Sequence, residues 1–182
     1  FVFYEAATQE RVPLVLRRDA TWTRARRKMV IENFGRYPVH DVFFIHREGA
    51  RAFTFRASEI AAGGAVTFVV EDHPLATDLR GELHTLLVAP PPSADAPGEC
   101  VTGRNPAVPV SRASGHRIYK EEVDLILRIW GARFFDTQGT SIIYREGTPQ
   151  LDEVMPLSIY TDMYHSIELR RAGLALWQGL TL

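Results

Sequence analysis

The segment Val39-His40-Asp41-Val42-Phe43-Phe44-Ile45-His46-Arg47 decides the fold class of this chain. In an extended chain, Phe43 and Ile45 fall on one face and Val42 and Phe44 fall on the other, because successive side chains of a strand point to opposite sides. A strand with one face in water needs only one apolar face. The sequence therefore predicts a central strand with apolar groups on both faces.

Further strand-like segments surround this one in the first seventy residues. They alternate with period two and are separated by turn residues such as Glu48-Gly49 and Gly63-Gly64. Several short strands at this spacing predict an antiparallel β-sandwich of the immunoglobulin-like type. The expected strands are Phe1–Ala6, Val12–Arg17, Arg27–Asn33, Val39–Arg47, Ala52–Arg56 and Ala65–Glu71.

Beyond residue 72 the hydrophobic period changes to that of a helix. Pro74 suits a first helical turn, Asp72 places a carboxylate near its N-terminus, and Gly81 weakens the helix by about 1 kcal/mol relative to alanine. A second helix is expected at about Ile118–Phe135, where Asp124 and Arg128 have the spacing of an i,i+4 ion pair. The two apolar stripes are Leu75, Leu79, Leu83, Leu86 and Leu87, and then Val123, Ile126, Leu127, Trp130 and Phe134.

The last part of the chain reads as short strands around one helical turn. Thr148-Pro149 has the composition of a capped helix start. The apolar tail Leu174–Leu182 is expected either as a last strand in the core or as an exposed segment that docks on another chain, and the core is favoured. The other expected strands are Ser141–Arg145, Leu157–Thr161 and Ser166–Arg171.

Proline distribution suggests how the chain is divided. Residues 89–115 contain Pro90-Pro91-Pro92 and Pro97-Gly98 and few large apolar groups, which predicts a long irregular connection. We therefore expect an α+β protein: an immunoglobulin-like sandwich over residues 1–72, a helix and proline-rich connection over 73–115, and a small helix-plus-strands unit over 116–182.

Composition limits the partners of the chain. Its 182 residues are 46% hydrophobic and carry a formal net charge of -1, so no overall field attracts nucleic acid or an anionic membrane. No uncharged stretch reaches the roughly 18 residues of a membrane-spanning helix. The chain opens at Phe1, which implies either a removed leader or a longer parent chain. We expect a globular protein that neither spans a membrane nor binds nucleic acid.

Reactive side chains are scattered rather than grouped in known motifs. Cys100 is the single cysteine, and it has no histidine placed by sequence to activate it. His40 and His46 share strand parity but lie about 20 Å apart, too far to hold one metal ion. Glu71-Asp72-His73 is explained by acidic residues at a helix start. We therefore expect no catalytic residue, no metal site and no cofactor.

A basic cluster is the strongest charge feature of the chain. It suits either an anionic binding patch or a charged strand edge that discourages aggregation, and the second interpretation is favoured. The cluster consists of Arg17, Arg18, Arg24, Arg26, Arg27 and Lys28, with Trp22 inside it.

Aromatic residues near the end of the chain are the candidate contact residues. Tyrosine at a hairpin tip can anchor a partner, and an apolar terminal segment is costly to leave in water. The surface candidates are Trp22, Tyr160, Asp162, Tyr164, His165 and Trp177.

The order of these segments resembles a loose group of uncharacterised, exported-type bacterial proteins. The resemblance spans about 27–174 and is carried by packing residues. They run from Met29-Val30-Ile31-Glu32-Asn33 and Val39-His40-Asp41-Val42-Phe43-Phe44 through Lys120-Glu121-Glu122, Ile129-Trp130, Phe134-Phe135 and Gly139-Thr140 to Ile142-Ile143-Tyr144 and Met155-Pro156-Leu157. It implies a sandwich followed by a helix-plus-strand unit and an extracytoplasmic location, and it supplies no catalytic residues.

Three hypotheses for function follow. The first is a non-enzymatic structural or protein-interaction module of a bacterial envelope or multi-subunit assembly, with other protein subunits as partners. The second is a carbohydrate-binding module that stacks a glycan on Trp22, Tyr160 or Tyr164. The third is a divergent hydrolase, which would need Glu121, Glu122 or His116 in one pocket.

Overall fold

A computed structural model describes residues 12–23, 26–70, 78–88, 118, 120–156 and 173–180 of the chain. These residues form an α+β fold whose strands are paired antiparallel in two sheets. The elements are β1 (Leu14–Arg18), β2 (Arg27–Asn33), β3 (Val39–Glu48), β4 (Arg51–Ile60), β5 (Ala65–Val70), α1 (Leu79–Leu87), α2 (Lys120–Phe135), β6 (Gly139–Glu146), α3 (Thr148–Val154) and β7 (Gly173–Leu180).

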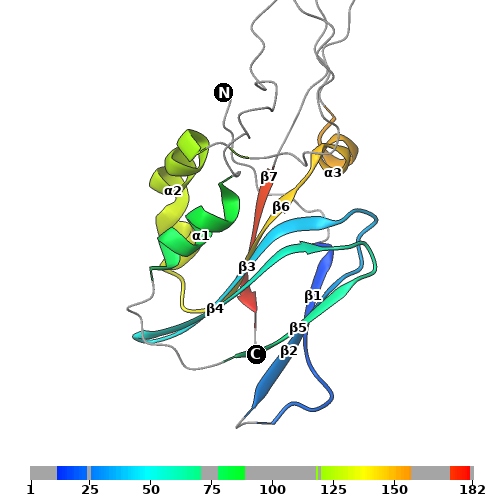
Figure 1. The fold of residues 1–182 in the computed structure, drawn as a ribbon, viewed down its shortest axis with the longest axis vertical. Helices are drawn as coiled ribbons and strands as arrows, with labels where there is room; N and C mark the ends of the chain where they lie inside the picture. The colour runs from blue at the N-terminus through cyan, green and yellow to red at the C-terminus, as the bar shows by residue number, and fades with distance from the viewer. Residues whose placement is uncertain are drawn as a thin grey trace, which may run out of the picture.

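The two sheets have the strand orders β1-β2-β5 and β4-β3-β6-β7. β3 lies inside the larger sheet between β4 and β6, as its two apolar faces predict. The hairpins on either side of β4 turn at Gly49 and Gly63, where positive φ angles of 58° and 69° favour glycine. Figure 1 shows the smaller sheet on one side of the larger sheet and α1 and α2 on the other.

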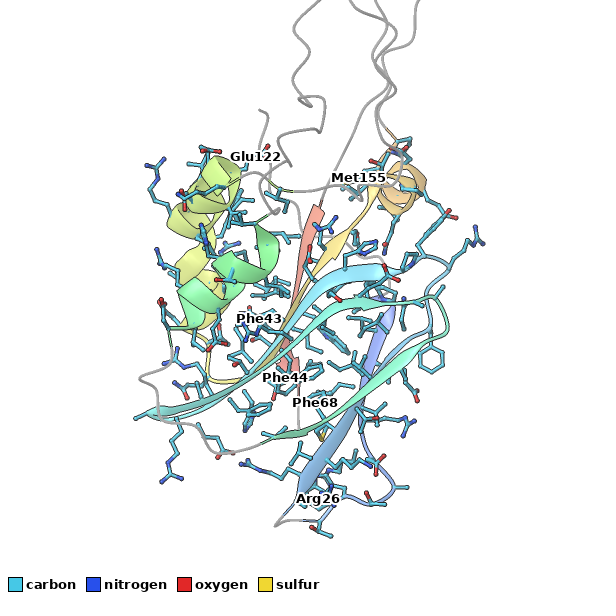
Figure 2. All side chains as sticks on the ribbon, in the orientation of Figure 1. Arg26, Phe43, Phe44, Phe68, Glu122 and Met155 are labelled. Carbon is cyan, nitrogen blue, oxygen red and sulfur yellow. The ribbon has the colours of Figure 1, made fainter. Side chains whose placement is uncertain are left out.

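A separate hydrophobic cluster packs on each face of the larger sheet. Phe44 points toward the smaller sheet and Phe43 toward the helices, and neither has any exposed surface (Figure 2). The inter-sheet cluster consists of Leu14, Met29, Ile31, Val39, Val42, Phe44, Phe53, Ile60, Phe68, Val70, Ile142 and Tyr144. The helix-side cluster consists of Phe43, Ile45, Leu83, Leu87, Ile118, Val123, Ile126, Leu127, Phe134, Phe135 and Ile143.

Asn33 joins three segments at one end of the inter-sheet cluster. Its amide nitrogen donates to the carbonyl oxygens of Tyr37 at 2.9 Å, Ile60 at 3.0 Å and Ala61 at 3.2 Å. Its side-chain oxygen accepts a bond from the Gly35 N–H at 2.9 Å. Because the residue is buried, these bonds satisfy groups that water does not reach. One side chain thus fixes the β2–β3 loop against the β4–β5 turn.

The segment after residue 116 shares a sheet with the first part of the chain. β6 pairs with β3, and β7 pairs with β6, so the larger sheet crosses the divisions at residues 72 and 115 expected from the sequence. β7 overlaps the apolar tail expected from the sequence and occupies the edge of this sheet. The other expected C-terminal strands, Leu157–Thr161 and Ser166–Arg171, lie outside the described residues, as do Phe1–Ala6 and 89–115.

The helix caps and one helix ion pair differ from the sequence-based expectation. α1 begins at Leu79, and its N-cap is Asp78, whose carboxylate accepts the Gly81 N–H at 2.9 Å; Asp72 and Pro74 of the expected start lie outside the described residues. α3 begins at Thr148 as expected, but the expected side-chain cap is absent, because its N-cap is Gly147, which has no side chain to bond. Asp124 pairs with Lys120 at 2.5 Å one turn earlier and with His84 of α1 at 3.0 Å, and not with Arg128.

Candidate interaction surfaces

β7 forms one edge of the larger sheet. Its inner side pairs with β6 from Gly173 to Leu180, and no strand of the described residues pairs with its outer side. A strand in this position presents a row of backbone N–H and C=O groups that can accept a further strand. The register shifts near Gln178, and Gly179 has a φ of 75°, so a bulge interrupts only the last part of the strand.

Both hydrophobic clusters reach the edge at β7. Leu174 and Leu176 pack on the helix-side cluster, and Ala175 and Trp177 pack on the inter-sheet cluster. All four side chains are only half-buried. The expected surface candidate Trp177 therefore lies at this edge, with part of its surface in the core and part outside it. An added strand would have apolar neighbours on both of its faces.

The charge of β7 distinguishes it from two other edge strands. β4, at the opposite edge of the same sheet, carries Arg51, Arg56 and Glu59, and β1 carries Arg17 and Arg18. Charged side chains of this kind oppose pairing between sheet edges. β7 has no charged residue.

β5 also lacks charge, but its surroundings differ from those of β7. Phe68 of β5 stacks on Phe55 of β4 with ring centroids 4.3 Å apart. β5 therefore lies beside a strand of the other sheet.

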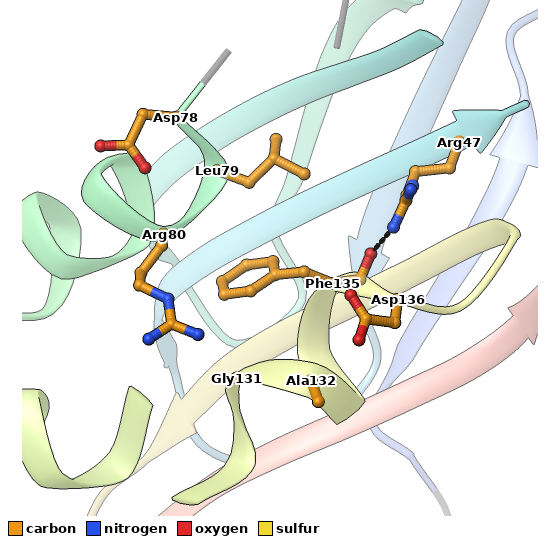
Figure 3. Close-up of a pocket in the computed structure, with 8 residues that line it drawn as sticks. All are labelled: Arg47, Asp78, Leu79, Arg80, Gly131, Ala132, Phe135 and Asp136. Carbon is orange, nitrogen blue, oxygen red and sulfur yellow. Dashed lines mark hydrogen bonds between the residues drawn. The ribbon is translucent and has the colours of Figure 1, made fainter. Parts of the chain in front are cut away.

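A groove of about 380 Å³ lies between the start of α1, the end of α2 and β3 (Figure 3). Arg47 donates to the carbonyl oxygen of Phe135, the last residue of α2, and so satisfies a group at the helix end. Arg80 lies over Gly131, which has no Cβ to displace its guanidinium. The groove is lined by Arg47, Asp78, Leu79, Arg80, Gly131, Ala132, Phe135 and Asp136.

The charges of this groove balance, so its chemistry does not select one class of ligand. It contains two arginines and two aspartates, and two of these four also hold helix ends: Asp78 caps α1, and Arg47 binds α2. No motif signalled these residues in the sequence, because they come from three separate segments. The arrangement is compatible with a structural role.

A buried ion pair lies at the start of β3. Arg145 of β6 donates to Asp41 at 2.5 Å, and their side chains are 9% and 16% exposed. Asp41 has a φ of 49°, and the β3–β6 register shifts beside it, which marks a bulge. One guanidinium nitrogen of Arg145 is shielded from solvent and has no hydrogen-bond partner. A ligand would have to displace protein to reach it, so the pair acts as a structural link.

His40 contacts the same end of the sheet. Its imidazole lies 3.3 Å from the carboxylate of Glu59 on β4. Burial lowers the pKa of His40, and the nearby positive charge of Arg145 lowers it further. The imidazole therefore favours its neutral form.

Glu146 and Tyr144 form a second polar group, on the inter-sheet side. Burial raises the pKa of the Glu146 carboxyl, and a hydrogen bond with Tyr144 partly opposes this shift. Burial also raises the pKa of the Tyr144 phenol. Gln150 of α3 donates to Glu146 at 2.8 Å and so links α3 to the end of β6.

His46 lies between a hydroxyl and a carboxylate, an order of groups also found in hydrolase sites. Its Nδ1 is 2.9 Å from the Thr140 hydroxyl, and its Nε2 is 3.2 Å from Glu48, a separation without hydrogen-bond geometry. Thr140 has no exposed surface, so a substrate cannot approach its hydroxyl. The arrangement links β3 to β6.

Three residues of the basic cluster, Arg17, Arg18 and Lys28, are engaged in local contacts. Arg17 forms an ion pair with Glu32, and Lys28 lies 3.2 Å from Asp19. Hydrogen bonds from Thr21, with the charge of Lys28, lower the pKa of Asp19 to about 2. The guanidinium of Arg18 lies 4.3 Å from the ring centroid of Trp22.

Trp22 has two sets of contacts. Arg18 covers one face of its ring, and the side chain packs on the inter-sheet cluster. Glu121 and Glu122 lie in the first turn of α2. Outside the described residues lie Tyr160, Asp162, Tyr164, His165, Cys100, His116, Arg24 and 71–73.

Within the described ranges, histidine, cysteine and acidic side chains form no group of three or more that could hold a metal ion. No helix in the same ranges is long and apolar enough to cross a membrane. The described part of the chain is an α+β protein with two antiparallel sheets and an uncharged, half-buried edge strand. Comparisons of the chain with protein-family models, curated proteins and solved structures give no match.

Proposed function

We propose that this protein is a non-enzymatic structural or protein-interaction module that binds other protein chains through the edge at β7. The observation that carries the proposal is the combination of an outer side without a strand partner among the described residues, no charge and half-buried apolar groups on both faces. Strand addition at such an edge is a common mode of protein recognition, because backbone hydrogen bonds supply affinity and side chains supply specificity.

The described histidines support a role without catalysis. Each has a polar partner on a neighbouring element: His40 lies near Glu59 of β4, His46 bonds Thr140 of β6, and His84 bonds Asp124 of α2. A general acid or base needs a reacting group within hydrogen-bond reach in an accessible pocket. The groove, in turn, contains no histidine among its lining residues.

The strand orders support an immunoglobulin-like sandwich as the architecture of this module. β1-β2-β5 corresponds to strands A, B and E of that fold, and β4-β3-β6-β7 corresponds to C′, C, F and G. On this proposal, α1 and α2 belong to an insertion between E and F. The resemblance drawn from the sequence further suggests a location in the bacterial envelope, outside the cytoplasm.

Native mass spectrometry and light scattering of the purified chain test the proposed function. We expect an assembly heavier than one chain, containing either further copies or an added partner subunit. A monomer over the whole micromolar range that binds no other chain, including partners co-expressed from the same genomic neighbourhood, would contradict the proposal. Glycan binding that is lost on Trp22→Ala would favour a carbohydrate-binding module instead.

A further inference from the structure

We propose that the occupant of the β7 edge is β7 of a second copy of this chain, paired antiparallel. This inference rests on the proposed function and specifies its partner. Pairing two such edges joins the larger sheets of the two copies into one continuous sheet. The interface is then isologous, which is the arrangement of most homodimers.

The composition of the edge selects this occupant. An incoming strand must place apolar side chains toward the helix-side cluster and toward the inter-sheet cluster at once, because both clusters end at β7. It must also bring no charge, because the edge offers no opposite charge to pair with it. β7 meets both requirements, with Leu174 and Leu176 on one face and Ala175 and Trp177 on the other.

Symmetry restricts how the two strands can meet. A two-fold axis perpendicular to the sheet keeps the helices of both copies on the same face, and residues opposite one another then point to the same side. An axis that passes near Leu176 places Ala175 of each copy opposite Trp177 of the other. A small side chain then lies against a large one on the inter-sheet face. The bulge at Gln178–Gly179 limits the paired stretch to the middle of the strand.

Ala175→Lys, with Ala57→Lys as a matched control, tests this interface. Ala175 and Ala57 are half-buried, occupy the two edge strands of the same sheet and pack on the same inter-sheet cluster. Lysine should therefore cost each variant a similar amount of folding stability, and only Ala175→Lys places like charges near the proposed two-fold axis. Sedimentation equilibrium of the wild type and both variants, with circular dichroism to confirm folding, measures the effect.

We expect a wild-type dimer with a dissociation constant of about micromolar, since one strand pair buries a small area. Ala175→Lys should weaken the dimer by about tenfold or more, and Ala57→Lys should leave it unchanged. Amide hydrogen exchange of the wild type gives a second measurement that needs no variant: exchange of β7 amides should slow as protein concentration rises.

The possible failures separate this inference from the proposed function. A dimer that Ala175→Lys and Ala57→Lys weaken equally, or β7 exchange that does not change with concentration, overturns the pairing of β7 with itself. A monomer that binds a different protein through β7 overturns the second copy as occupant and leaves the proposed function standing. A monomer without any partner overturns both.

Discussion

The two faces of the larger sheet carry clusters of different construction. The inter-sheet cluster contains a group of aromatic rings, in which Phe44 lies 4.8 Å from Phe68 and 6.1 Å from Phe53. Asn33 closes one end of it with four hydrogen bonds. The helix-side cluster places aliphatic side chains around three phenylalanines, of which Phe134 and Phe135 lie 6.1 Å apart. Polar links such as Thr54–Glu82 and His84–Asp124 lie at its surface.

This difference indicates that the two clusters have different tasks. Buried hydrogen bonds and ring contacts fix the relative positions of the strands, because each depends on direction as well as proximity. Aliphatic contacts between helices and a sheet tolerate small shifts at lower cost. We therefore expect the inter-sheet cluster to determine the register of the sheets, and the helix side to accept substitution more readily.

Truncating the two adjacent phenylalanines of β3 should have the largest effect and sharpen the comparison. Phe44→Ala and Phe43→Ala each remove a fully buried ring, for which we expect losses of about 3–5 kcal/mol in the free energy of unfolding. Phe44→Ala should cost about 1 kcal/mol more, because its ring has two edge-to-face partners. Chemical denaturation measures both. Equal losses, or a larger loss at Phe43, would remove the proposed difference.

Asn33→Ala should have the next largest effect. It removes the donor for the Tyr37 carbonyl in the β2–β3 loop and for two carbonyls at the β4–β5 turn, and it removes the acceptor for Gly35. We expect a loss of about 2–3 kcal/mol. His84→Ala is the helix-side control and should cost less than about 1 kcal/mol, since the bond to Asp124 lies at the surface. Thermal unfolding of both variants distinguishes the two cases. A small loss for Asn33→Ala would mean that water replaces its bonds.

Strand β3 and the contacts of Asn33 show what the sequence can and cannot predict. The two apolar faces of β3 follow from alternation along one segment, and so the central strand was predictable. The bonds of Asn33 to Ile60 and Ala61 cross 27 and 28 residues, and the pair Asp41–Arg145 crosses 104. No local pattern encodes contacts at such separations.

Local sequence patterns fail to predict a contact when two possible partners have the same spacing. They also fail to predict whether a strand lies at the edge or in the middle of a sheet. Asp124 has basic residues four positions away on both sides, and the structure pairs it with Lys120 and not Arg128. The apolar tail predicted either a core strand or a docking segment. As an edge strand, β7 combines features of both, because its position at the edge depends on the order of all four strands.

The carboxyl groups of Glu146 and Asp124 allow the same two regions to be compared through the pH dependence of stability, where smaller free-energy changes are expected. On the inter-sheet side, burial raises the pKa of Glu146 above 4.5, so the unfolded chain ionises first. The contribution of Glu146 to stability therefore falls as the pH rises from about 4.5 through the raised pKa. Glu146→Gln cannot ionise and should gain stability relative to the wild type across this window, by less than about 1 kcal/mol.

Asp124 on the helix side should show the opposite sign. The hydrogen bond from Lys120, with a smaller contribution from His84, lowers the pKa of Asp124 below 3.8. Its contribution to stability is present above that value and is lost as the pH falls through the lowered pKa. Asp124→Asn should therefore show its full loss of stability relative to the wild type above about pH 4, and this loss should shrink as the pH falls through the lowered pKa. Denaturation at several pH values measures both differences, and parallel curves for the two variants would contradict the assignment.

The last comparison uses two glycines, one on each side of the sheet. A Cβ at Gly131 of α2 would lie 2.7 Å from the far end of the Arg80 side chain, which is flexible and can move into solvent. Alanine also favours a helix by up to about 1 kcal/mol over glycine. Gly131→Ala should therefore change the free energy of unfolding by between zero and about 1 kcal/mol in the stabilising direction.

A Cβ at Gly35 meets a different environment. It would lie 2.8 Å from the Cβ of Pro13 and 2.9 Å from the Asn33 side-chain oxygen, the acceptor of the Gly35 N–H. Neither neighbour can move without disturbing the bonds at the end of the inter-sheet cluster. Gly35→Ala should therefore destabilise the protein by about 1 kcal/mol or more, since packed interiors respond poorly to added volume. One denaturation series measures the change in the free energy of unfolding for both alanine variants. Opposite signs would establish that the helix side accommodates an added methyl group and the inter-sheet side does not. Equal signs would reject that difference.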